Sequence, residues 1–358
     1  MKKAIRGIVA FSVLAIIIIF VIKLVQDSKI GTNASERQLI LAGQKYYKEN
    51  SYLLPRINYE SKTISSNALI NSGFLKQTVD NNGVPKSCES YVTVTRVNGE
   101  FFYNPFVKCG TNDDTLLLYD KLVSMARNEI KDGTNGLFKL DNRYVYRGDK
   151  PNNFVTFAGK LWRIIEIDSD RNIKMFYDGD FAKVRVWDNR YNPNILKTVG
   201  INDYQISRIR DYLISYLNNI DNFSNKSKSK LAYMNLCIAP RDLTNLSIDG
   251  SLECIQRQGN QLIGLPTVSE YLNASNDSSC PSDIRACSNY NFMARVKSFW
   301  TITPVLGTTE KVYRVYTNEG LIERDAISEH FVYPVIALKP DVAILNGEGT
   351  YKNPYILK

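Results

Sequence analysis

The sequence predicts an α+β fold in which an N-terminal transmembrane helix precedes two small domains outside the membrane. Three observations predict it: a long apolar run near the N-terminus, a helical pattern followed by a hairpin signal, and a strand-rich second half with one clear amphipathic helix. A length of 358 residues suffices for one anchor and two modest domains. We expect a cytoplasmic N-terminus at residues 1–7, a signal anchor at 8–25, a membrane-proximal domain at 26–136 and a distal domain at 137–358.

An apolar run at residues 8–22 follows three basic residues in the first six positions. Lys23 can place its ammonium at the interface while its stem stays in the lipid, so a span that ends at Val25 is allowed. Positive charge on the N-terminal side predicts that this end stays in the cytoplasm. The sequence therefore predicts a single-pass protein of the cell membrane with an extracellular C-terminus.

The segment after the apolar run decides whether the anchor is cleaved. No small-residue site of the A-x-A type follows the run, and the first small pair, Thr32 and Ala34, lies too far downstream. We therefore expect the N-terminal helix to be retained. A prepilin-type cut after Gly7 is the alternative and would leave Ile8 as the first residue.

The formal charge of +9 does not predict a nucleic-acid partner, because the basic residues are spread along the chain and form no patch or arm. Outside a cell, a basic surface favours anionic wall polymers or lipid head groups. A simpler interpretation is that a chain rich in Lys, Asn, Ile and Tyr reflects AT-biased coding. The hydrophobic content of 44% is ordinary for a globular chain.

Six cysteines indicate disulfides, since an even count is typical of exported chains. They fall in neighbouring pairs, so local bridging is the simplest of the fifteen connectivities. The sequence predicts the bridges 88–109, 237–254 and 280–287, formed by Cys88, Cys109, Cys237, Cys254, Cys280 and Cys287. A single histidine, His330, leaves little for a Cys/His zinc site, and neither a metal nor a cofactor is predicted.

The membrane-proximal domain is predicted to combine helices with one hairpin. Its expected elements are an amphipathic helix at 33–50, a second amphipathic piece at 66–74, and strands at 91–96 and 100–108. Asn33 or Ser35 can cap the first helix, and the Leu-Leu-Pro sequence at 53–55 stops it. Asn98-Gly99 is the strongest hairpin signal in the chain.

A membrane helix that runs on as a stalk with Tyr46-Tyr47, the Leu-Pro stop, and a hairpin between Cys88 and Cys109 follow one another in this part of the chain. This layout, over residues 1–110, resembles that of type IV pilin-like and pseudopilin-like surface proteins. The resemblance implies a structural subunit of a secretion or pilus-like assembly, processed after Gly7. Ser12 would then stand fifth, where pilin-like proteins usually carry a glutamate.

The second half is predicted to consist mainly of strands. A helix at 115–130 and a Gly-containing connection at 132–136 precede it, and this connection is the best domain boundary. An amphipathic helix is expected at 203–220, then a polar, loop-rich stretch, then a short helix that opens at 264–267. Predicted strands lie at 144–146, 154–157, 161–167, 173–177, 299–303, 312–316, 321–324 and 332–338.

Several segments of this half carry a second resemblance. They are a Trp-Arg strand at 157–165, Gly-Leu-Pro-Thr at 264–267, Trp-Thr-Ile-Thr-Pro at 300–304, a hairpin at 312–320 and a Pro-Val-Ile strand at 333–338. Their order, over residues 140–340, is similar to that of an uncharacterised domain family of exported bacterial proteins related to the C-type lectin-like and formylglycine-generating-enzyme-like fold. The resemblance implies a C-type-lectin-like mixed sheet with two helices and long loops. It implies no reaction, because fold does not fix function.

Trp187, Asp188 and Asn189 are the candidate ligand-binding residues. Calcium-dependent lectins use a Trp-Asn-Asp element, and the same residue types stand here in another order, without a Glu-Pro-Asn partner. Their oxygens can hold Ca²⁺, yet a turn uses such residues for backbone hydrogen bonds, and the turn is the preferred interpretation. Trp187 lies near a predicted loop and can face a ligand, whereas Trp162 and Trp300 lie in strands, where large aromatics fill the core.

The sequence offers no catalytic constellation. Cys280 and Cys287 have no nearby histidine to lower a thiol pKa, and His330 has no Ser or Cys elbow motif to pair with. The Gly-rich tail lacks the features of a phosphate-binding loop. We therefore expect a membrane-anchored, non-catalytic binding or adhesion module at the bacterial surface, whose partner is a cell-wall polymer, a glycan or a surface protein. A pseudopilin-like structural subunit is the alternative.

Overall fold

The computed structural model describes residues 33–77, 88–110, 114–179, 183–244, 247–280, 282–317 and 319–358. The chain divides into two compact units, Met1–Thr115 with Lys358, and Leu116–Leu357. This division lies earlier than the boundary expected at residues 132–136. Leu118 and Leu122 explain the difference, because both are buried in the second unit, where the Leu118 N–H donates to the Val342 carbonyl at 3.0 Å.

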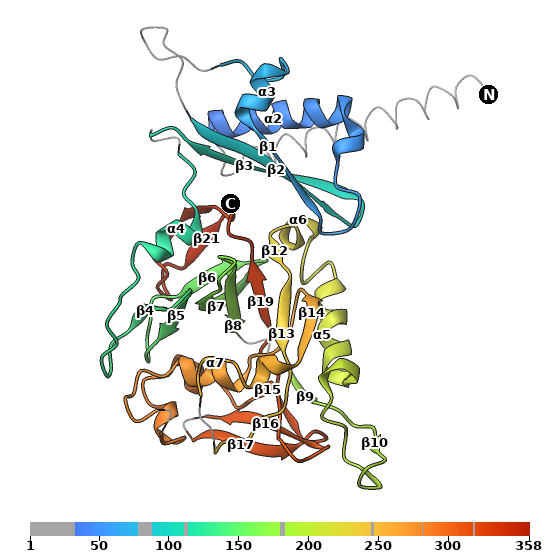
Figure 1. Ribbon diagram of the computed structural model, residues 1–358, viewed down its shortest axis with the longest axis vertical. Helices are drawn as coiled ribbons and strands as arrows, with labels where there is room; N and C mark the ends of the chain where they lie inside the picture. Colours follow the sequence, from blue (N-terminus) through green and yellow to red (C-terminus); the bar gives the residue numbers. More distant parts are fainter. Residues whose placement is uncertain are drawn as a thin grey trace, which may run out of the picture. The chain divides into compact units, whose positions relative to one another are not determined.

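The first unit is a three-stranded antiparallel sheet with α2 packed against it (Figure 1). Its elements are α2 (Ala34–Glu49), η1 (Ser51–Leu53), β1 (Ser61–Ser65), α3 (Ser66–Asn71), β2 (Glu89–Val97) and β3 (Glu100–Lys108), with strand order β1-β2-β3. Of the two caps considered for the first helix, Asn33 is the one used. Its side chain accepts the Glu36 N–H at 2.8 Å, and the Glu36 carboxylate accepts the Asn33 N–H at 3.1 Å, which forms a capping box.

The core of the first unit lies between α2 and the sheet. Leu39 and Tyr47, on one face of α2, are buried with Val92 of β2. Gly43 allows the close approach of the two elements: a Cβ at this position would lie 2.6 Å from the Val92 Cγ1 atom. The close contact between α2 and β2 therefore requires glycine, which has no side chain, at position 43.

The hairpin and the three disulfides predicted from the sequence are confirmed. Asn98 and Gly99 have φ angles of 51° and 85°, the positive values that a two-residue type I′ turn requires. The bridges are Cys88–Cys109, Cys237–Cys254 and Cys280–Cys287, with Cα–Cα distances of 4.5, 4.3 and 4.8 Å. The first bridge joins the chain before β2 to the chain after β3, at the open end of the hairpin.

The second unit holds the remaining elements. Its helices are α4 (Leu118–Val123), η2 (Tyr204–Ile206), α5 (Arg208–Asn218), α6 (Asn225–Lys228), η3 (Glu253–Ile255), α7 (Val268–Asn273), η4 (Ala286–Ser288) and η5 (Phe292–Arg295). Its earlier strands are β4 (Gly136–Leu140), β5 (Arg143–Arg147), β6 (Phe154–Phe157), β7 (Lys160–Ile167), β8 (Ile173–Tyr177), β9 (Val184–Val186), β10 (Tyr191–Asn192), β11 (Lys197–Thr198), β12 (Leu231–Ala232) and β13 (Met234–Cys237). Its later strands are β14 (Arg257–Gln261), β15 (Phe299–Pro304), β16 (Lys311–Tyr316), β17 (Gly320–Asp325), β18 (Glu329–Phe331), β19 (Val335–Leu338), β20 (Ile344–Asn346) and β21 (Tyr355–Leu357).

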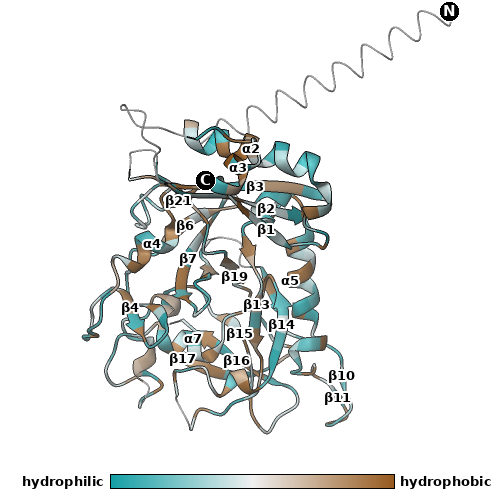
Figure 2. Ribbon diagram, turned by 45° about the horizontal axis from the view of Figure 1, so that its top comes forward, coloured by the Kyte–Doolittle hydropathy of each residue, from teal (hydrophilic) through white to brown (hydrophobic). Residues whose placement is uncertain are grey.

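Two sheets form the body of the second unit (Figure 1). The nine-stranded sheet runs β12-β19-β8-β7-β6-β21-β20, with β5 pairing to β7 and β4 to β5, and the five-stranded sheet runs β17-β16-β15-β18-β9. Two short pairs, β10–β11 and β13–β14, lie apart from them. Phe176 of β8 lies 5.3 Å from Phe299 of β15 between ring centroids, so aromatic side chains connect the two sheets. Figure 2 shows the hydrophobic residues of β7 and β19 that contribute to this core.

The predicted α+β fold with a transmembrane helix is wrong, because the structure is mostly β-sheet, with 35% strand and 21% helix. The helix expected at 115–130 shortens to α4, since Leu118 and Leu122 are the only buried apolar residues along it and Arg127 then bridges to Phe138. The stretch expected to be loop contains β12, β13 and β14. β12 has only two residues and β14 has no apolar side chain, so neither shows an apolar strand pattern, and β12 pairs with β19 far along the chain.

Within the ranges that the structure describes, no helix is long and apolar enough to cross a membrane. This finding overturns the prediction of a single-pass membrane protein with a cytoplasmic N-terminus. α2, expected to continue the anchor, has 16 residues and carries charged side chains such as Arg37, Lys45 and Lys48, which lipid would have to desolvate. The predicted span at residues 8–25 lies outside the described residues.

Candidate functional site

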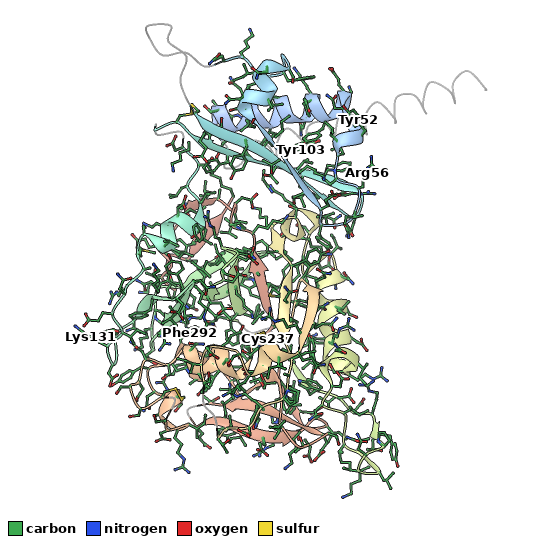
Figure 3. All side chains as sticks on the ribbon, viewed as in Figure 1. Tyr52, Arg56, Tyr103, Lys131, Cys237 and Phe292 are labelled. Carbon is green, nitrogen blue, oxygen red and sulfur yellow. A yellow bond between two sulfur atoms is a disulfide. The ribbon has the colours of Figure 1, made fainter. Side chains whose placement is uncertain are left out.

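A polar cavity of about 230 Å³ lies within the second unit. The β7–β8 hairpin, β13, the chain around the Cys237–Cys254 bridge and the start of α7 line it. Lys174 and Glu270 are its most buried charged pair, whereas Tyr233 and Asn235 are exposed at its rim. Figure 3 labels Cys237, which marks the position of the cavity among the side chains.

Glu270 reaches the cavity because α7 starts with a capping box. The Thr267 hydroxyl accepts the Glu270 N–H at 3.0 Å, and the Glu270 Oε2 atom accepts the Thr267 N–H at 2.9 Å. The other oxygen, Oε1, forms an ion pair with the Lys174 ammonium. The side chains of the two partners are only 15% (Lys174) and 9% (Glu270) exposed, so the pair is largely shielded from water.

The ion pair lies in a surplus of carboxyl groups. Burial lowers the pKa of Lys174. The Glu270 and Glu166 carboxylates raise it by more than burial lowers it, so the pKa of Lys174 lies above its ordinary value. Burial raises the pKa of Glu270, and the Lys174 ammonium offsets only part of this effect. Six carboxyl groups and three cationic side chains line the cavity. The lining therefore favours a ligand that donates hydrogen bonds over one that is an anion.

Hydrogen bonds hold the walls of the cavity in place. Arg143 donates to the Glu166 carboxylate at 3.2 Å and to the Ile248 carbonyl at 3.1 Å. The Asp168 carboxylate accepts the Asn172 N–H at 2.8 Å, which closes the predicted β7–β8 turn. Side chains that are ordered in advance lose less conformational entropy when a ligand binds.

A fully buried ion pair behind the wall joins the disulfide-closed loop to α7. Arg241 and Glu253 have side chains 1% and 0% exposed, and their charged atoms lie 3.3 Å apart. The Glu253 carboxylate also accepts the Ser269 N–H at 2.9 Å, and Arg241 donates to the Ser269 hydroxyl at 3.0 Å. This network fixes the loop against the first turn of α7.

The predicted ligand residues do not converge on one surface. Trp187 is fully buried, and its indole N–H donates to the Thr301 carbonyl at 3.1 Å. Asp188 is also buried and accepts the Arg190 guanidinium at 2.7 Å. Burial raises the pKa of Asp188, but hydrogen bonds from Arg190 and from backbone N–H groups lower it below its ordinary value. Asn189 alone is exposed.

The other residues considered for catalysis or metal binding, the cysteines and His330, are not arranged for either role. All six cysteines of the sequence are in disulfides, so Cys280 and Cys287 are bonded to one another. Burial, with Arg314 and Arg324 nearby, lowers the pKa of His330 to about 4. In the described part of the chain, no group of three or more His, Cys, Asp or Glu side chains is placed to hold a metal ion.

No protein-family model, curated protein or solved structure matches the chain. The pilin-like and C-type-lectin-like resemblances therefore stay predictions. The sequence reasoning missed the cavity as a whole. Two of its parts do have a local signal: the turn at 169–172, and the Thr-x-x-Glu spacing of Thr267 and Glu270, which is the pattern of a capping box.

Proposed function

We propose that the protein is a non-catalytic binding module that acts outside the cell, and that the cavity around Lys174 and Glu270 binds its ligand. The observation that carries the proposal is the cavity lining, in which fixed, planar polar side chains lie beside the exposed ring of Tyr233. The ligand class that fits this lining best is a saccharide unit of a glycan or cell-wall polymer.

The chemistry of saccharides supports this choice. Their hydroxyl groups both donate and accept hydrogen bonds, and planar groups such as those of Arg143, Glu166 and Asn235 can each bind two neighbouring hydroxyls. Tyr233, which is 45% exposed, offers a ring face to the apolar side of a sugar. The cavity is smaller than the roughly 300–1,000 Å³ pockets that take drug-sized ligands, which favours a single sugar ring.

The disulfides support an extracellular place of action. Three bridges that join all six cysteines are typical of chains that fold in an oxidising compartment. A binding module outside the cell meets glycans and wall polymers there as its most abundant partners.

A binding screen of the full chain against glycans and wall polymers, with and without calcium, tests the proposal. Tyr233→Ala is expected to weaken saccharide binding about tenfold, or ~1.4 kcal/mol. Tyr191→Ala removes a comparably exposed tyrosine, 53% exposed on β10 outside the cavity lining, and is expected to leave affinity unchanged. Absence of binding, or an equal loss in both variants, would contradict the proposal. Binding that requires calcium would also contradict the assignment to this cavity, because no group of acidic side chains in the described part of the chain is placed to hold a metal ion.

A pseudopilin-like structural subunit is the second candidate. The first unit supports it, because α2 precedes a hairpin of β2 and β3 that a disulfide closes, and Leu41 of α2 remains 57% exposed. This candidate predicts Ile8 as the N-terminal residue and assembly that increases with concentration. N-terminal sequencing and sedimentation velocity test it: an intact Met1 together with a monomer at every concentration would exclude it.

A further inference from the structure

The five-stranded sheet carries a row of side chains that crosses all five strands on one face. Trp300 of β15 pairs with Arg314 of β16, and Arg314 pairs with Ile322 of β17. Toward the other edge, His330 of β18 pairs with Arg185 of β9. Directly paired residues point to the same face. The rings of Trp300 and His330 meet edge to face with centroids 4.7 Å apart, which joins the two halves of the row.

This face carries three arginines and, among the described strand residues, no carboxylate. Side chains alternate along a strand, so Arg324 shares the face with Ile322, while Glu323 and Glu329 point to the opposite side. We call Arg185, Arg314 and Arg324, together with His330, the arginine face. Arg324 is exposed, Arg185 is half-buried and Arg314 is only 7% exposed.

The charge of Arg314 is only partly offset by a carboxylate, that of Glu319, which acts on it without forming an ion pair. No carboxylate forms an ion pair with it in the part of the chain that the structure describes, and its guanidinium lies against the Tyr316 ring and the His330 imidazole. Burial and the nearby Arg324 lower the pKa of Arg314, and Tyr316 and the Glu319 carboxylate offset only part of this effect. A buried cation without an anion is unfavourable. A bound anion would therefore improve the electrostatics of this face.

Two buried donors on the same face also lack an acceptor. Arg314 Nη1 lies 3.1 Å from His330 Nδ1, so this nitrogen is the acceptor and the neutral imidazole carries its proton on Nε2. The N–H groups of Arg314 Nε and His330 Nε2 have no hydrogen-bond partner among the described residues. Donors without acceptors on a cationic face are suited to anionic oxygens.

We infer that the arginine face binds a linear anionic polymer whose repeating unit carries a phosphate group. Strands lie about 4.8 Å apart, and three strand intervals separate Arg185 from Arg314, so the positive charge extends over about 14 Å. That span exceeds one phosphate and suits successive phosphates along a chain. Successive phosphates can accept from the exposed Arg324 and the half-buried Arg185, while their negative charge offsets that of the buried Arg314. This inference does not depend on the saccharide cavity.

His330 makes a direct test possible, because it is the only histidine in the sequence. In NMR spectra of the full chain without a histidine tag, its imidazole resonances need no assignment. Titration with a glycerol-phosphate oligomer is expected to shift these resonances and to raise the His330 pKa from about 4, since a nearby negative charge favours the imidazolium form. Unchanged His330 resonances on saturation with the oligomer would overturn the inference.

Two variants locate the site. Arg324→Gln is expected to weaken oligomer binding about two- to fivefold, the effect of one exposed charge contact. Arg285→Gln makes the same change of charge at an exposed arginine outside the arginine face and is expected to have no effect. Equal weakening in both variants would overturn the location. Inorganic phosphate and a polyuronate, at matched charge concentration, are the comparison ligands. If either shifts the His330 resonances as much as the oligomer does, the assignment to a phosphate polymer is overturned.

Discussion

Glu270 binds Lys174 with one carboxylate oxygen and caps its own helix with the other, which accepts the Thr267 N–H at 2.9 Å. The most buried part of the cavity and the first turn of α7 therefore depend on one side chain. Lys174 in turn is the cation that Glu270, Glu166 and Asp168 share. A change at Lys174 is expected to affect both the cavity and the helix.

Lys174→Met should lower the free energy of unfolding by about 3 kcal/mol at pH 7, because it leaves buried carboxylates without their cation. The folded-state pKa of Lys174 is raised, so its contribution is complete at pH 7 and is lost only as pH rises past 10.5. The deficit of the variant should shrink at pH 4.5, where Glu270, whose pKa burial raises, takes up a proton. Urea unfolding at both pH values measures this. Lys197→Met, at an exposed lysine, is the control, and an equal deficit at both pH values would contradict the prediction.

Arg241 and Glu253 should show strong energetic coupling. Glu253→Ala removes the carboxylate that balances the buried Arg241 guanidinium, and we expect a loss of about 3–5 kcal/mol. The double variant Arg241→Met/Glu253→Leu removes both charges and should lose less than the two single variants together. A double-mutant cycle from urea unfolding measures the coupling, and additive losses would show that the pair is not a unit.

The parts of the fold that were predictable from the sequence are those fixed by near neighbours. Asn98-Gly99 sets a hairpin by its own backbone preferences, and the close spacing of each cysteine pair left local bridging as the simplest connectivity. The cavity was not predictable, because Arg143, Lys174 and Glu270 meet only after distant strands pair. Trp187 illustrates the same limit: its polar neighbours in the sequence left a ligand-facing ring open, but the tertiary fold buries it against Thr301.

Removal of the disulfides should cost stability in the order of their loop lengths. The Cys237–Cys254 bridge spans 17 residues in sequence and the Cys280–Cys287 bridge spans 7. A loop of about 15 residues corresponds to about 3 kcal/mol of restricted unfolded-state entropy, and a shorter loop to less. We expect the double serine variant of the first pair to lose more stability than that of the second. Urea midpoints of the two variants at equal protein concentration decide the order.

His330 should make the protein less stable as the pH falls below 6.5. Burial, together with Arg314 and Arg324, lowers its folded-state pKa from the ordinary 6.5 to about 4. Between these values the unfolded chain binds more protons than the folded one, so the free energy of unfolding decreases as pH falls. His330→Gln should lose less stability than the natural chain between pH 7 and pH 5. Parallel pH profiles for the two proteins would show that the imidazole does not drive the loss.

Gly43 and Val92 should be coupled in the first unit, because a Cβ on Gly43 would lie 2.6 Å from Val92 Cγ1. Alanine is favoured over glycine in a helix by about 1 kcal/mol, yet forcing a methyl group into a packed core costs about 1–3 kcal/mol. We therefore expect Gly43→Ala to be neutral or destabilising, and far less favourable than helix propensity alone predicts.

Val92→Ala supplies the matching half of the test. It removes the methyl groups that obstruct position 43, so Gly43→Ala should stabilise the Val92→Ala background by about the helix-propensity gain of ~1 kcal/mol. The sign of the Gly43→Ala effect thus depends on the residue at position 92. Amide exchange of β2 in the four proteins measures the cycle within the first unit. Stabilisation by Gly43→Ala alone, of the same size in both backgrounds, would show that α2 and β2 are not in tight contact here.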